Sequence, residues 1–86
     1  MKITFEYEDI ENDDVRIKVD TTELTIFVTA TIYNFNREVV SRNKKVFYTK
    51  CKNKEKFFTI LKNNIGNMGA DTRKTYLEWV SNLEKR

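Results

Sequence analysis

The spacing of apolar residues changes once along this chain, near Asn53, from every second residue to every third or fourth. Alternation with period two predicts strands that bury one face, whereas spacings of three and four predict amphipathic helices. The alternating segments all precede the helical ones. Strands followed by helices predict an α+β fold, with the helices packed on one face of an antiparallel sheet.

Three alternating segments lie in the first two-fifths of the chain, at residues 2–8, 15–19 and 23–34. Short turns separate them, which predicts an antiparallel meander. The third segment is apolar on both faces, because Phe27 and Tyr33 alternate with the residues expected in the core. We expect its second face to be covered by other strands, a helix or a second copy of the protein. If the helices cover the first face, an open Phe27 and Tyr33 face favours homodimerisation or partner docking.

The segment from residue 35 to residue 51 is harder to assign. Val39 and Val40 predict a short fourth strand, and residues 41–44 predict the turn that ends it. Residues 46–51 again have the pattern of a strand. The meander is therefore expected to contain three to five strands.

Two helices are expected after the strands. Asn53 is a capping residue, and residues 57–65 have helical spacing up to Gly66, where we expect a left-handed C-terminal cap. Asp71 is expected to cap the second helix. Its apolar stripe is expected to contain Tyr76, Trp79, Val80 and Leu83, widened by Leu77.

The length of 86 residues predicts one domain, residues 1–86, with a thin core. Cys51 is the only cysteine, so no intrachain disulfide can form, and its alternation with Phe47 predicts a buried thiol. The first ten residues carry acidic side chains where a signal peptide needs apolar ones. The longest apolar run, residues 24–33, is too short to span a bilayer. We therefore expect a cytoplasmic protein without a membrane partner.

Histidine is absent, which removes Ser-His and Cys-His nucleophile pairs and the usual general base near neutral pH. One thiol and no imidazole cannot fill a zinc site. Asp9, Glu11, Asp13 and Asp20 have spacing that faintly echoes a calcium loop, but the glycine of such a loop is missing and strands flank the segment. We interpret it as a solvated turn and expect no catalytic residues, no metal and no cofactor.

Charge is distributed unevenly along the chain. Residues 1–36 carry a net charge of −5 and residues 37–86 a net charge of +8. Such asymmetry is typical of a protein with a charged partner. The residue usage also follows AT-rich codons, with abundant Lys, Asn and Ile, which indicates an AT-rich bacterium or one of its phages or plasmids. We expect a gene of a phage or other mobile element.

The first functional hypothesis is a non-enzymatic binding protein that inhibits or modulates a host protein. Acidic side chains near the first hairpin would mimic the phosphates of DNA and occupy a nuclease, as in anti-CRISPR or anti-restriction inhibitors. The expected partner-binding residues are Glu6, Glu8, Asp9, Glu11, Asp13 and Asp14.

The alternative hypothesis is a nucleic-acid-binding accessory or regulatory protein that uses the basic segment 37–62. Aromatic side chains in or near this segment would stack on bases. The expected residues are Arg37, Arg42, Lys44, Lys45, Lys50, Lys52, Tyr33 and Tyr48. Both charge clusters are also compatible with an ordinary solvated surface.

Overall fold

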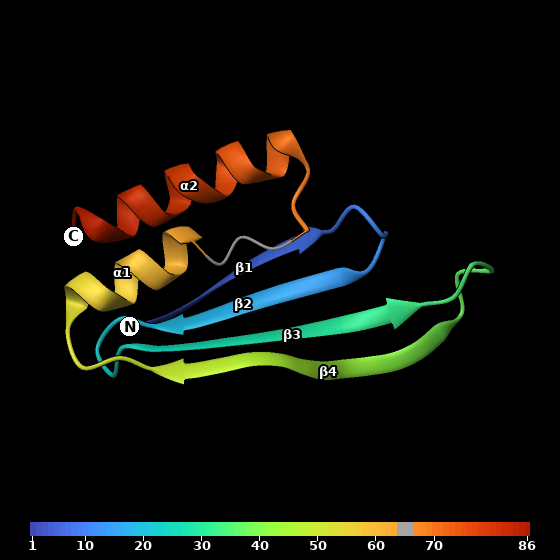
Figure 1. Ribbon diagram of the computed structural model, residues 1–86, viewed down its shortest axis with the longest axis horizontal. Helices are drawn as coiled ribbons and strands as arrows, with labels where there is room; N and C mark the ends of the chain where they lie inside the picture. The colour runs from blue at the N-terminus through green and yellow to red at the C-terminus, as the bar shows by residue number, and fades with distance from the viewer. Residues whose placement is uncertain (64–66) are drawn as a thin grey trace.

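The computed structural model describes residues 1–63 and 67–86. The strands come first: β1 (Lys2–Glu8), β2 (Asp14–Asp20), β3 (Thr25–Tyr33) and β4 (Val39–Lys50). The helices α1 (Lys54–Asn63) and α2 (Ala70–Glu84) follow. All four strands form one antiparallel sheet in the order β1-β2-β3-β4, and both helices lie on the same side of it (Figure 1). The predicted α+β fold, a meander followed by two helices, is confirmed.

The strand register determines which side chains share a face. Ile17 of β2 lies opposite Phe5 of β1 on one side and Val28 of β3 on the other, and Val28 lies opposite Phe47 of β4. This row faces the helices. This row and the neighbouring rows on the same face pack against the helices and form the core. The core residues outside the sheet are Cys51, Phe57, Phe58, Leu61, Met68, Tyr76, Val80 and Leu83. The predicted burial of Cys51 is confirmed.

The two helices are joined by a buried polar contact as well as by packing. The Tyr76 hydroxyl of α2 donates a hydrogen bond to the Leu61 carbonyl of α1 at 2.7 Å. Phe5 of the sheet places its ring 5.2 Å from those of both Tyr76 and Trp79, measured between centroids. Tyr76 and Trp79 therefore belong to the core. Neither α1 nor α2 is long and apolar enough to cross a membrane.

The predicted helix starts are right for α1 and wrong for α2. The Asn53 side chain accepts a hydrogen bond from the Lys56 amide at 2.8 Å, which is an N-terminal cap. Gly69 occupies the capping position of α2, and Asp71 lies in the first turn instead. Leu77 is exposed and does not widen the apolar stripe. The expected cap at Gly66 and the end of the residue 57–65 pattern lie outside the described residues.

The turn predicted at residues 41–44 is also wrong, because this segment lies inside the continuous strand β4. The register between β3 and β4 shifts at three places, and Asn43 has a positive φ of 54°. A strand at the edge of a sheet can absorb extra residues as bulges without reversing direction. The Ser-Arg-Asn-Lys composition that indicated a turn is accommodated by these irregularities.

The turn between β2 and β3 is longer than predicted, since β3 begins at Thr25. Leu24 lies in the turn with a φ of 58° but still packs against the core. Asp20 holds this turn by accepting hydrogen bonds from the amides of Thr22 and Glu23. These bonds, chiefly the one from Glu23, lower the pKa of the Asp20 carboxyl below its ordinary value.

Candidate functional site

Because both helices cover one side of the sheet, the other side has no covering layer among the described residues (Figure 1). We call this side the open face. It carries the strand residues that alternate with the core rows: Lys2, Thr4, Glu6, Glu8, Asp14, Arg16, Lys18, Asp20, Thr25, Phe27, Thr29, Thr31, Tyr33, Lys45, Tyr48 and Lys50. Charged and aromatic side chains therefore share a surface that the pleat keeps away from the core.

Two aromatic rings lie on this face near the start of β3 and the end of β4. Phe27 and Tyr48 are direct cross-strand partners with ring centroids 6.1 Å apart in an edge-to-face arrangement. Tyr48 is 52% exposed, although it lies in a strand. Because the two rings are nearly perpendicular, they do not form one flat surface; the exposed Tyr48 ring offers the face that a planar ligand can stack on, with the edge-to-face contact to Phe27 holding it in place.

Lysines surround this ring pair. Lys18 lies opposite Phe27 on β2, and Lys45 places its ammonium 5.9 Å from the centre of the Tyr48 ring. Lys50 follows two residues after Tyr48 on the same strand face, and Lys2 lines the same shallow depression as Phe27 and Tyr48. We call Lys2, Lys18, Phe27, Lys45, Tyr48 and Lys50 the basic-aromatic patch.

The acidic residues beside the patch are engaged within the protein. Asp20 accepts the two turn amides and lies 3.7 Å from the N-terminal ammonium of Met1. Glu23 forms an exposed ion pair with Lys50 at 3.4 Å. Exposed pairs of this kind contribute little stability and exchange readily with other partners. The Lys50 ammonium is therefore accessible to an anionic ligand.

The other end of the open face is polar and internally bonded. Glu6 pairs with Arg16 at 2.8 Å, and the Tyr33 hydroxyl donates to Asp14 at 2.6 Å. This hydrogen bond to Asp14 raises the pKa of Tyr33 above its ordinary value. The Arg37 guanidinium lies 4.4 Å from the Tyr33 ring centre. Tyr33 is thus held by two partners and differs from the freer Tyr48.

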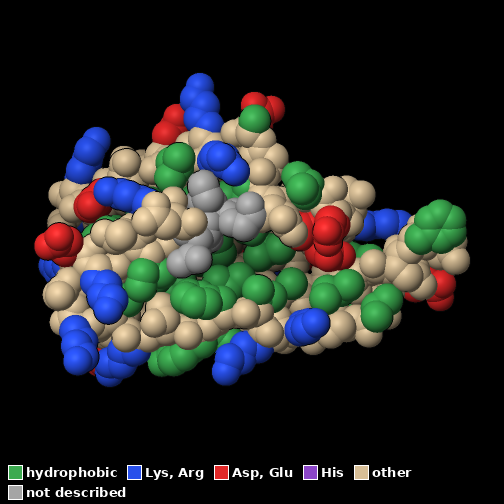
Figure 2. Space-filling view, viewed as in Figure 1, with side chains coloured by type: hydrophobic (Ala, Val, Ile, Leu, Met, Phe, Trp, Pro, Cys, Tyr) green, Lys and Arg blue, Asp and Glu red, His purple; other side chains and the backbone are tan. Residues whose placement is uncertain are grey.

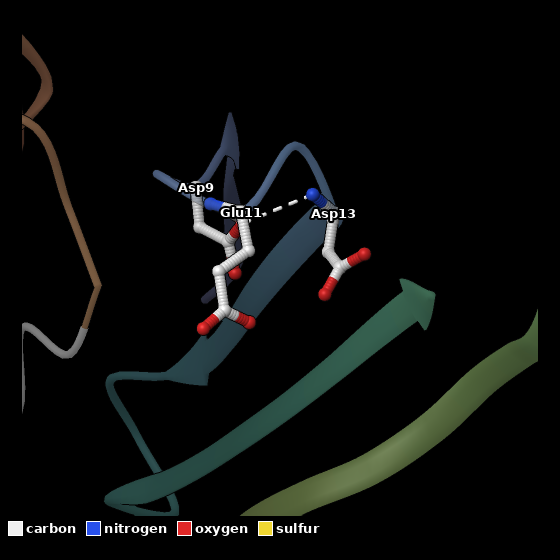
Figure 3. Close-up of side chains that lie close together, drawn as sticks. All are labelled: Asp9, Glu11 and Asp13. Carbon is white, nitrogen blue, oxygen red and sulfur yellow. Dashed lines mark hydrogen bonds between the residues drawn. The ribbon is translucent and has the colours of Figure 1, made fainter. Parts of the chain in front are cut away.

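The turn between β1 and β2 gathers three carboxylates. Asp9, Glu11 and Asp13 place one carboxylate oxygen each within 4.8 Å of the others, and Figure 3 shows them on the same side of the turn. Asp9 also accepts hydrogen bonds from the amides of Glu11 and Asp13, so it stabilises the turn. Among the described residues this is the one group of three side chains spaced to share a metal ion. Asp20 lies at the opposite end of β2 and takes no part in it.

The six acidic residues predicted as one partner surface are divided by the sheet. Glu8 pairs with Asp14 in the register, and with Glu6 they lie on the open face. Asp9, Glu11 and Asp13 lie in the turn beyond the strands. Alternation along β1 and the turn after it separate residues that are adjacent in sequence.

The predicted basic residues are likewise divided. Lys45 and Lys50 lie on the open face with Tyr48, whereas Lys44 is the partner of Ala30 and lies on the helix side. The remaining residues are dispersed: the half-buried Tyr33 and the exposed Arg37 lie near the β3–β4 hairpin, Arg42 at the polar end of the open face, and Lys52 beyond β4.

Three residues of the basic-aromatic patch were absent from the predicted nucleic-acid site. Lys2 and Lys18 come from the acidic part of the chain, and Phe27 was noted only for the apolar character of its face. The alternation along each strand places Lys2, Lys18 and Phe27 on the face away from Phe5 and Ile17, so the sequence pattern did indicate that they share a face. The strand pairing that brings them beside Tyr48 was the missing information.

No protein-family model matches this chain, and no curated protein or solved structure is significantly similar to it. What the protein binds is therefore inferred from its own side chains.

Proposed function

We propose that the protein is a non-enzymatic binding protein that holds single-stranded nucleic acid on the basic-aromatic patch of its open face. The observation that carries this proposal is the exposed Tyr48 ring, in contact with the half-buried Phe27, with lysines of β1, β2 and β4 around it. Aromatic rings on a sheet face with helices behind it are a recurrent platform for unstacked bases. Lysine ammonium groups around such rings would neutralise phosphates.

A single strand fits this surface better than a duplex. Bases must turn toward the sheet to stack on Tyr48, and only an unpaired strand presents base faces in that way. Glu6, Glu8 and Asp14 at the far end of the open face would also repel the second strand of a duplex. The bound segment is therefore expected to follow β3 and β4 and to avoid β1 near Glu8.

The hypothesis of a host-protein inhibitor that mimics DNA stays a prediction with less support. Such mimicry requires a continuous row of free carboxylates. Here Glu6 is paired with Arg16, Asp14 with the Tyr33 hydroxyl, and Asp9 with turn amides. Asp13 also accepts a hydrogen bond from the Tyr33 amide at 3.1 Å. Of the six residues, Glu8 and Glu11 are therefore left without a partner identified in the described part of the chain, which is a short track for a nucleic-acid channel.

The test is fluorescence anisotropy of a labelled thymidine oligonucleotide of about 10 nucleotides. We expect the logarithm of the binding constant to fall with the logarithm of salt concentration, by about 0.7 per phosphate contacted. Lys45→Glu should weaken binding by about tenfold or more. Tyr48→Leu should cost about 1–3 kcal/mol of binding free energy, while Tyr48→Phe retains the ring and the affinity.

The pleat of β4 supplies a matched control. Lys44 carries the same charge next to Lys45 but lies on the helix side of the sheet. Lys44→Glu should therefore change affinity much less than Lys45→Glu. Equal losses for the two variants would show that net charge alone drives binding, and no binding of the wild-type protein at low salt would refute the proposal.

A further inference from the structure

The helices cover only part of their side of the sheet. Beyond them lies a groove of about 520 Å³ with an apolar floor formed by Val15, Ala30, Ile32 and Phe47. Figure 2 shows hydrophobic side chains lining a hollow below the helices, with acidic groups at its right-hand end. The groove is on the opposite side of the sheet from the basic-aromatic patch, because Val15 and Ala30 alternate with Arg16 and Thr29.

Apolar exposure extends around this groove. Val46, which lies on its β4 side, is 59% exposed, and Ile10 in the acidic turn is 65% exposed. Exposed apolar side chains that adjoin an apolar groove form a contiguous patch, and such patches are typical of interaction sites. The bulge that shifts the register between Val28 and Thr29 places Val46 opposite no residue of β3. It is therefore not fixed in a cross-strand pair.

The charges of the groove specify what it accepts. Among the residues that the structure describes, its charged lining consists of Asp9, Glu11 and Asp13, without a lysine or arginine. The chain as a whole has a net charge of +3, so this acidic apolar site contrasts with the rest of the protein. A nucleic acid would be repelled here. A ligand that matches both features has a large apolar group next to a cation.

From this complementarity we infer that the groove binds a segment of a partner protein that presents one or two large apolar side chains beside a lysine or arginine. The apolar side chains occupy the floor over Val15 and Ala30, and the cation lies against the carboxylates of Glu11 and Asp13. This site is independent of the nucleic-acid proposal, because it lies on the other side of the sheet and has the opposite charge. The protein would then join a partner protein to a bound strand.

The experiment uses the full chain and three labelled hexapeptides, with anisotropy as the readout. The first peptide has leucine and phenylalanine between lysines, the second replaces the lysines by glutamates, and the third replaces the apolar residues by serines. We expect the first peptide to bind at least about tenfold more tightly than either of the others. Equal binding of the lysine-containing peptides would show unspecific charge attraction and overturn the inference.

Two variants locate the site. Glu11→Lys removes an exposed carboxylate, and only the backbone amide of Glu11 has a hydrogen bond identified within the described turn. Val46→Lys places a charge at the apolar rim. Each variant should bind the first peptide about tenfold more weakly than the wild-type protein does. Glu78→Lys, on the exposed surface of α2, should leave the affinity for this peptide unchanged. If Val46→Lys fails to fold, Glu11→Lys still decides the result. Unchanged peptide binding in Glu11→Lys would refute the site.

The other possible occupants give distinct results. Dimerisation of the wild-type protein that Val46→Lys abolishes, measured by sedimentation, would assign the groove to a second copy and overturn the inference. Calcium binding at Asp9, Glu11 and Asp13 that displaces the peptide would assign the carboxylates to a metal instead. Loss of oligonucleotide binding with retained peptide binding would leave this inference standing while refuting the proposed function.

Discussion

Tyr76 is the residue in which packing and hydrogen bonding coincide most closely. Its side chain is almost fully buried between α1, α2 and the sheet, and its hydroxyl reaches the Leu61 carbonyl. A buried hydroxyl that finds a partner contributes both apolar area and a satisfied polar group. The sequence indicated the burial of Tyr76 through its place on the helical stripe. It did not indicate the acceptor, which lies 15 residues away on another helix.

Tyr76→Phe should therefore destabilise the fold by about 1 kcal/mol. The reason is that the Leu61 carbonyl loses a buried donor while the ring and its contacts remain. Urea unfolding followed by the fluorescence of Trp79 measures the change. Tyr48→Phe is the control, because Tyr48 is half-exposed and its hydroxyl makes no hydrogen bond identified in the described residues; it should change stability by less than about 0.5 kcal/mol.

The same residue predicts how stability depends on alkaline pH. Burial raises the pKa of Tyr76 well above its ordinary value of 10.0. The unfolded chain then loses this proton at lower pH than the folded chain does, so stability falls as pH rises above 10.0. In Tyr76→Phe the decline should be smaller over the same range. An identical decline in both proteins, measured by urea unfolding at each pH, would contradict the assignment.

Among the elements, β4 is the one whose structure departs most from its sequence pattern. Val39 and Val40 indicated a short strand and residues 41–44 a turn, but the chain continues in one direction through both. A prediction from local residue preferences includes the turn-forming residues 41–44 but not their pairing with the long strand β3. Cross-strand pairing with β3 overrides this propensity and leaves its trace as bulges. Strands β1 and β2 were predictable because their alternation is regular.

Asn43 tests this description of β4, because it has a positive φ of 54° within the irregular segment. Glycine adopts this conformation without a steric penalty, and asparagine tolerates it because its short polar side chain can hydrogen-bond to nearby backbone, whereas alanine adopts it at a cost of about 1 kcal/mol or more. Asn43→Gly should therefore be nearly neutral and Asn43→Ala destabilising by about 1 kcal/mol in urea unfolding. Equal stability of the two variants would show that the strained conformation is not maintained in solution.

At the scale of the whole molecule, the acidic first part and the basic second part of the chain do not form separate acidic and basic ends of the fold. The meander interleaves its strands, so that Lys18 from the acidic part of the chain lies beside Phe27 and near Tyr48. The pleat places the basic-aromatic patch on the open face and the apolar floor of the groove on the helix side, and the turn between β1 and β2 adds the carboxylates at the end of the groove. The sequence shows the charges and the alternation. The pairing of β4 with β3, which completes the patch, follows only from the fold.

The β3–β4 hairpin also shapes the molecule, which measures 42 × 24 × 18 Å along its principal axes. In Figure 1 the hairpin extends past the helices, and this overhang leaves both sides of the sheet accessible beyond them. Phe35 in the hairpin is 96% exposed. The sequence led us to expect that another layer covers the second face of β3. Because both helices lie on the other side of the sheet, this face belongs instead to the open face, where a ligand can reach it.

Methyl NMR of the protein titrated with a thymidine oligonucleotide tests the central claim most directly, because methyl groups report on the two faces separately. Thr4, Thr25 and Thr29 carry methyl groups on the open face, and Val15, Ala30 and Ile32 carry them in the groove. The predicted result is a shift of the threonine methyl resonances with little change in those of the groove. Shifts confined to the groove, or the absence of any shift at low salt, would contradict the assignment of the open face as the nucleic-acid surface.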